Sequence, residues 1–195
     1  MVNSCFYHLR RIKSIRRSLS TFTAVKLVNS FIISRCDYCN NILAAVPACQ
    51  ISRMQAVLNF AARLIHGRSR YDHVTDLIGD RLHWLSVQHR FRFKCAVLVY
   101  RALYGIAPSH ISRLCVKQPV VELRYELRSA APSQYDLAVP ATKTQFGGRS
   151  FTVAGSSTRN SLPDFVKDAE SLDIFKTRLK THFFRESYGA PLTLI

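Results

Sequence analysis

The chain has 195 residues, of which 48% are hydrophobic, and a formal net charge of +16. This length allows one ordinary domain or two small ones, and the hydrophobic content argues against global disorder. The strong positive charge favours a polyanionic partner, with nucleic acid ahead of an anionic membrane. The alternative is a soluble protein that is merely basic.

The positive charge is concentrated in the first part of the chain. Residues 1–116 carry 17 Lys and Arg against four Asp, whereas residues 117–195 carry 11 Lys and Arg against eight acidic residues. Fourteen of the first 17 are Arg, whose planar guanidinium fits phosphate oxygens better than an ammonium group does. A nucleic-acid surface is therefore expected within residues 1–116.

Residues 4–19 are predicted to form an amphipathic helix. Its apolar face carries Cys5, His8, Ile12, Ile15 and Leu19. Its basic residues are Arg10, Arg11, Lys13, Arg16 and Arg17. Like charges this close repel one another unless an anion lies near. The basic face is thus either a solvated surface or a contact for phosphate.

Two more helices are expected over residues 22–44 and 49–66. Ser20 or Thr21 can cap the first, Pro47 separates the two, and Gly67 ends the second. The buried side of the second is predicted to hold Ile51, Met54, Leu58, Ala61, Ala62 and Ile65. Arg68 and Arg70 follow in a loop.

Residues 88–104 are predicted to form a central helix, because apolar residues cover nearly its whole circumference. Its polar stripe consists of Arg90, Lys94 and Arg101. Gly105 and Pro108 are expected to end it. The pattern indicates a core helix with one basic edge.

The pattern changes after Lys117. Short alternating runs over residues 122–128, 135–139 and 149–154 predict strands, and residues 142–161 are expected to be strand and loop. A last helix is expected over residues 171–186, with Ser171 as its N-cap. The predicted fold is mostly α. An N-terminal helical bundle (1–116) precedes a small β-containing segment (117–162), a C-terminal helical region (163–186) and a tail (187–195).

Motifs for catalysis, metals and membranes are missing from the sequence. It has no Asp-Asp pair, no phosphate-binding glycine loop and no GxSxG motif. Cys36 and Cys39 have zinc-like spacing but lack a second close pair of ligands. The predictions are no enzymatic activity, no metal or cofactor, and no small-molecule substrate. Trp84 is expected in the core, with base stacking as the alternative.

The sequence also indicates where in the cell the protein is expected. Residues 1–9 contain no apolar signal segment, and no run is long enough to span a membrane. Several of the six cysteines lie on apolar helix faces. The sequence therefore predicts a reduced, intracellular protein of the nucleus or cytoplasm without membrane contact.

A series of short motifs runs in order from residue 5 to residue 186. In the first half they are Ser34, Asp37-Tyr38-Cys39-Asn40, Met54-Gln55, Asn59, Ala61-Ala62-Arg63-Leu64, Leu82-His83-Trp84-Leu85, Val87, Arg90, Phe93-Lys94 and Ala107-Pro108. In the second half they are Arg128-Ser129, Val139-Pro140, Gly148-Arg149-Ser150-Phe151, Asn160-Ser161-Leu162-Pro163, Phe175-Lys176 and Leu179-Lys180. Together they resemble the C-terminal part of the reverse transcriptase polyprotein of non-LTR retrotransposons (LINE elements), in the jockey and chicken-repeat groups.

The resemblance implies a thumb region in residues 1–116, which in such enzymes packs against the template–primer duplex. The fingers and palm, with the catalytic aspartates, and the endonuclease would lie upstream and are not present here. The chain departs from the family pattern at three positions. Cys36 stands for a usual Leu, Ser86 for a usual Pro, and Arg159 for a usual Trp.

The leading hypothesis is a non-catalytic reverse transcriptase fragment with a basic surface that binds the backbone of an RNA–DNA or DNA duplex without reading its sequence. The candidate contacts are Arg10, Arg11, Lys13, Arg16, Arg17, Arg68, Arg70, Arg90, Lys94 and Arg101. One alternative is a helical module that binds a protein, or itself, through exposed apolar faces. Another is a decayed element with no function.

Overall fold

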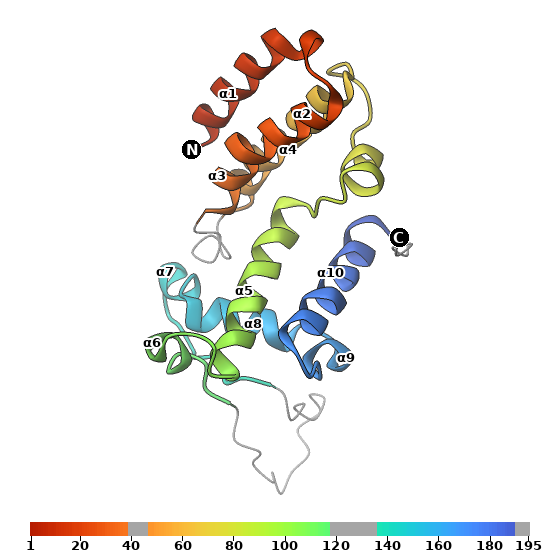
Figure 1. The fold of residues 1–195 in the computed structure, drawn as a ribbon. Coiled ribbons are helices and arrows are strands. Elements are labelled where there is room, and N and C mark those ends of the chain that lie inside the picture. The colour runs from red at the N-terminus through yellow and green to blue at the C-terminus, as the bar shows by residue number, and fades with distance from the viewer. Residues whose placement is uncertain (39–46, 118–135, 190–195) are drawn as a thin grey trace, which may run out of the picture. The chain divides into compact units, whose positions relative to one another are not determined.

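The computed structural model describes residues 1–38, 47–117 and 136–189. It is mostly helical, as predicted, and its contacts divide the chain into two compact units (Figure 1). Unit 1 comprises residues 1–40, 46–90 and 183–195, and unit 2 comprises residues 41–45 and 91–182.

Unit 1 is built on three helical segments. They are α1 (Val2–Ile15) with the short 3₁₀ turn η1 (Arg16–Ser18), the continuous run α2 (Thr21–Val28), η2 (Asn29–Ile33) and α3 (Ser34–Asp37), and α4 (Ala48–His66). The three segments pack side by side (Figure 1). The π-helical segment η4 (Leu77–Arg81), the start of α5 (Val87–Leu103) and the end of α10 (Leu172–Tyr188) complete the described part of the unit.

The core of unit 1 follows helical spacing in each segment. Its buried apolar members in these three segments are Cys5, Leu9, Ile12, Ala24, Val28, Ile32, Cys36, Met54, Val57, Leu58, Ala61, Ala62, Leu64 and Ile65. The predicted face of α1 is partly wrong. Leu9 is buried in place of His8, and Ile15 is half exposed because the α-helix ends there and the chain turns into η1.

The predicted ends of the helices in unit 1 are confirmed at two places. The Ser20 hydroxyl accepts a hydrogen bond from the Thr23 amide at 3.1 Å, which caps α2. Gly67 ends α4 with φ +64°, and the Arg68 amide then bonds the Arg63 carbonyl at 2.9 Å. A glycine adopts this left-handed conformation without strain, so the chain can turn away here.

Unit 2 holds the rest of α5 together with α6 (Ser109–Ser112), α7 (Gln145–Gly148), α8 (Phe151–Asn160), α9 (Asp164–Lys167) and most of α10. Helix α5 is a core helix as predicted, with Cys95, Ala96, Val99 and Tyr100 almost fully buried. The Tyr100 ring stacks on Phe175 at 4.5 Å, and its hydroxyl donates to the Ala169 carbonyl at 3.0 Å.

The predicted small β-containing segment is not seen. In the described ranges the only β pairing is an isolated antiparallel bridge between Lys117 and Leu137, and residues 122–128 lie outside those ranges. Residues 149–154 were expected as a strand, but α8 starts at Phe151. A short alternating run does not by itself distinguish a strand from a helix, and here the segment packs on α5 as a helix. A Cβ at Gly155 would lie 3.0 Å from Val99 of α5. The glycine lets α8 pack closely on α5.

Buried thiols make the fold sensitive to alkaline pH. Burial raises the pKa of Cys95 to about 11, from an ordinary value of 9.0. An unfolded chain loses this proton at lower pH than the folded chain, so stability is full below pH 9 and falls as the pH rises to about 11. We expect the urea midpoint to fall across this window, and to fall less in Cys95→Ala. Equal losses in both proteins would contradict this role of Cys95.

Candidate nucleic-acid interface

The outer face of α1 and the following turn form an exposed basic surface. Helix α1 buries Cys5, Leu9 and Ile12, so its other side faces solvent. The exposed cations of this segment are Arg10, Arg11, Lys13 and Arg17, which we call the α1 basic face. Lys13 lies at its edge, with Nζ 5.9 Å from the Phe60 ring of α4. Residues 1–38 contain a single acidic residue, Asp37. The α1 basic face therefore lies in a segment with a large excess of positive charge.

Arg16, also predicted as a contact, is used inside the fold. Its Nε donates to the Leu64 carbonyl at 2.9 Å and its second amino group donates to the Ile65 carbonyl at 2.6 Å. These carbonyls belong to the last turn of α4, where a helix leaves carbonyls unpaired and its dipole favours a cation. Arg16 thus joins the end of α1 to the end of α4.

The cations around the end of α4 act on His66. Burial lowers the pKa of His66, and the charges of Arg81, Arg68 and Arg16 lower it further. Arg68 and Arg70 are exposed in the loop after α4, as predicted. Arg81 was missed because it lies 13 positions from Arg68 in the sequence, and only the fold brings both near His66.

Arg90 is paired with a carboxylate. Its Nε and terminal amino group donate to the two carboxylate oxygens of Asp37 at 3.0 and 2.7 Å. This bidentate ion pair is partly buried and links α3 to the start of α5 within unit 1. Lys94 and Arg101 are exposed on α5, but they belong to unit 2 and are not part of the α1 basic face.

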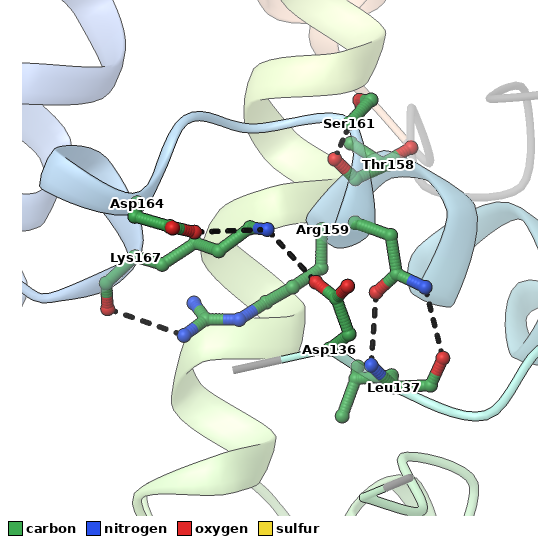
Figure 2. Close-up of polar contacts among 8 residues, drawn as sticks. Asp136, Leu137, Thr158, Arg159, Ser161, Asp164 and Lys167 are labelled. Carbon is green, nitrogen blue, oxygen red and sulfur yellow. Dashed lines mark hydrogen bonds and ion pairs between the residues drawn. The ribbon is translucent and has the colours of Figure 1, made fainter. Parts of the chain in front are cut away.

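Unit 2 contains a buried polar cluster that the sequence did not indicate as a site (Figure 2). The Asn160 side chain accepts from the Leu137 amide and donates to the Leu137 carbonyl, both at 2.9 Å. Lys167 Nζ lies 2.8 Å from an Asp136 oxygen and 3.5 Å from an Asp164 oxygen. These contacts hold the backbone around Leu137 against α8 and α9, which is a structural role.

Arg159 lies in the same cluster and is only 2% exposed. One terminal amino group donates to the Lys167 carbonyl at 3.2 Å, while the Nε and the other terminal nitrogen have no hydrogen-bond partner among the described residues. Burial lowers the pKa of Arg159, since the charged guanidinium loses its hydration there. The charge of Asp136 opposes this effect but does not cancel it, so the guanidinium charge is only partly compensated.

The described residues bear on three other predictions, which concern a metal site, base stacking and a membrane span. No group of three or more His, Cys, Asp or Glu among them is placed to hold a metal ion, and Cys39 of the zinc-like pair lies outside them. Trp84 is 9% exposed, which places its ring in the core as expected and excludes it as an open stacking surface. No helix in the described ranges has the length and apolar character needed to cross a membrane.

Comparisons with protein-family models, with characterised proteins and with solved structures found nothing that matches this chain.

Proposed function

We propose that this chain is a non-catalytic fragment of a retrotransposon reverse transcriptase that binds the backbone of a nucleic acid duplex without reading base sequence. The observation that carries the proposal is the α1 basic face, four exposed cations in a segment whose one acidic residue is Asp37, bound by Arg90. Such a surface attracts phosphates and releases their counterions on binding.

The fold narrows the set of contacts. The Arg16 guanidinium is bonded to α4 and the Arg90 guanidinium is bonded to Asp37. The proposal therefore relies on the α1 basic face together with Arg68 and Arg70. Lys94 and Arg101 remain predicted contacts from unit 2. Binding through six unit 1 cations would be strongly salt-dependent, because each neutralised phosphate adds about −0.9 to the slope of log affinity against log salt.

Neutralising the α1 basic face should therefore weaken binding to a duplex of any base sequence. The variant replaces Arg10, Arg11, Lys13 and Arg17 with Ala, which keeps α1 helical. We expect the salt slope for an RNA–DNA duplex to become shallower by roughly three to four, with affinity reduced most at low salt. Fluorescence anisotropy over a range of salt concentrations measures both quantities.

A matched control removes the same charge from unit 2. It replaces the exposed Arg113, Lys117, Lys143 and Arg149 with Ala. A slope equally shallow in this control would show that net charge, and not the α1 basic face, drives binding.

The alternative of an interaction module has one observation in its favour. A groove of about 510 Å³ beside α1 is lined by Tyr7, Ile15, Leu27 and Phe31 among others, and three of these side chains are 44–57% exposed. If the wild-type chain bound no duplex and its mass in light scattering rose with concentration, self-association through this groove would replace the proposal above.

A further inference from the structure

The loop after α4 presents an exposed aromatic ring on an anchored stretch of backbone. Gly67 turns the chain, and the Ser69 amide donates to the Asp72 carboxylate at 2.9 Å. The Arg63 guanidinium donates twice to the Asp72 carbonyl, at 3.1 and 3.0 Å. Tyr71 sits between these anchored points and is 88% exposed. An aromatic side chain presented in this way is available to a ligand.

Tyr71 borders a surface cavity of about 460 Å³. Leu77 lines it as a buried apolar residue, and Arg68 and Arg81 add two guanidinium groups. The volume lies within the range usual for sites that hold a small ligand or one unit of a polymer. All of the lining residues belong to unit 1.

The chemical groups that line the cavity determine which kind of ligand fits it. Asp72 and Asp76 also line it, so an isolated phosphate would meet carboxylates as well as guanidinium groups. A nucleotide uses all three kinds of group at once. Its base stacks on an aromatic ring, its amino groups donate to a carboxylate, and its phosphate meets arginine.

We propose that the cavity beside Tyr71 binds one unpaired nucleotide of a single-stranded nucleic acid, with the base stacked on Tyr71 and the phosphate at Arg68 and Arg81. A paired base presents only its edges, so a duplex contacts Arg68 through its phosphates but does not stack on Tyr71. The inference rests on the proposed function, and it adds a single-strand site to the duplex-binding face.

Changing Tyr71 tests the stacking. In Tyr71→Leu the π face is lost and an apolar side chain remains, whereas Tyr71→Phe keeps the ring and loses only the hydroxyl. The probes are a labelled 12-nucleotide single-stranded DNA of mixed sequence and a blunt duplex of the same sequence, measured by fluorescence anisotropy. Since Tyr71 is exposed, both variants should melt as the wild type does.

We expect Tyr71→Leu to weaken single-strand binding about tenfold and Tyr71→Phe to stay within about twofold, with the duplex unaffected in both. Arg81→Ala should reduce the salt slope of single-strand binding by about one. Single-strand affinity unchanged in Tyr71→Leu would overturn the inference, as would equal losses for single strand and duplex.

The two probes separate the inference from the proposed function. Normal, salt-dependent duplex binding together with Tyr71-independent single-strand binding overturns only the inference. Tyr71-dependent single-strand binding without duplex binding supports the inference and overturns the duplex proposal. Absence of binding to both probes overturns both.

Discussion

Replacing Arg159 with Met is expected to stabilise the protein by about 1–4 kcal/mol, although it removes a charged side chain and its hydrogen bond. Two guanidinium nitrogens of Arg159 are buried without a hydrogen-bond partner among the described residues, and each such donor costs about 1–3 kcal/mol. The interactions that offset this cost are one hydrogen bond to the Lys167 carbonyl, the Phe175 ring, 5.9 Å from the guanidinium carbon, and the charge of Asp136.

These favourable contributions are smaller than the cost of burying the guanidinium nitrogens without partners. A hydrogen bond from a charged group contributes about 1.5–3 kcal/mol and a cation–π contact about 0.5–2 kcal/mol, and at 3.2 and 5.9 Å both contacts lie toward the weak end. Met fills much of the same volume and needs no partner. The melting temperature should rise by several degrees, since 1 kcal/mol corresponds to about 2–4 °C in a chain of this size.

Arg159→Lys is the matched control, because it keeps the charge and shortens the side chain. We expect it to melt at or below the wild-type temperature, since a buried ammonium is no better compensated than the guanidinium. If Arg159→Met instead melted below the wild type, the guanidinium contacts would outweigh its desolvation.

The helix predictions are confirmed where interactions between residues close in the sequence decide the structure. The period of α5, the glycine after α4 and the serine before α2 act within one or two turns, and the structure has all three. The prediction was wrong for residues 149–154, where a short alternating run also fits a helix. The helix there packs on α5 with Gly155 against Val99, a tertiary contact that the local pattern does not report.

The candidate site was predictable only in part, for a physical reason. The residue type shows that an arginine is charged, and its position in the helical repeat indicates whether it is exposed. These two pieces of information were enough to predict the α1 basic face. Whether a guanidinium is already bonded depends on residues far along the chain. Arg16 meets Leu64 across 48 positions and Arg90 meets Asp37 across 53, so no local pattern could have removed them from the predicted contacts.

The Tyr71 cavity could not be predicted from the sequence for the same reason, because it depends on contacts made by the fold. The sequence directed the search for a stacking aromatic to Trp84, which the fold buries. It did not single out Tyr71, because nothing in a short polar loop reveals that the Arg63 side chain and the Ser69 amide bond the neighbouring Asp72 and anchor the backbone there. The signal that could have found it is an aromatic residue flanked by arginines, Arg68 and Arg70, directly after a helix.

Removing Asp136 should destabilise the protein by about 2–4 kcal/mol, because it leaves Lys167 buried with little compensation. The Lys167 side chain is 4% exposed and the Asp136 side chain 18%, so this pair is largely withdrawn from solvent. The measurement is a urea unfolding curve for Asp136→Ala. Asp164→Ala is the control, since Asp164 also lies near Lys167, at 3.5 Å, but is 65% exposed. We expect the control to lose less than about 1 kcal/mol, as surface pairs do.

A double-mutant cycle then isolates the pair. Lys167→Met keeps the length of the side chain and removes its charge, so Asp136→Ala combined with Lys167→Met leaves no buried ammonium without its partner. The double variant should be more stable than Asp136→Ala alone, with a coupling energy above about 1 kcal/mol. The desolvation cost of Lys167 is present only while its charge is present, so the second change relieves the damage done by the first. Losses that simply add, within about 0.5 kcal/mol, would mean that Asp136 stabilises the fold through contacts other than Lys167.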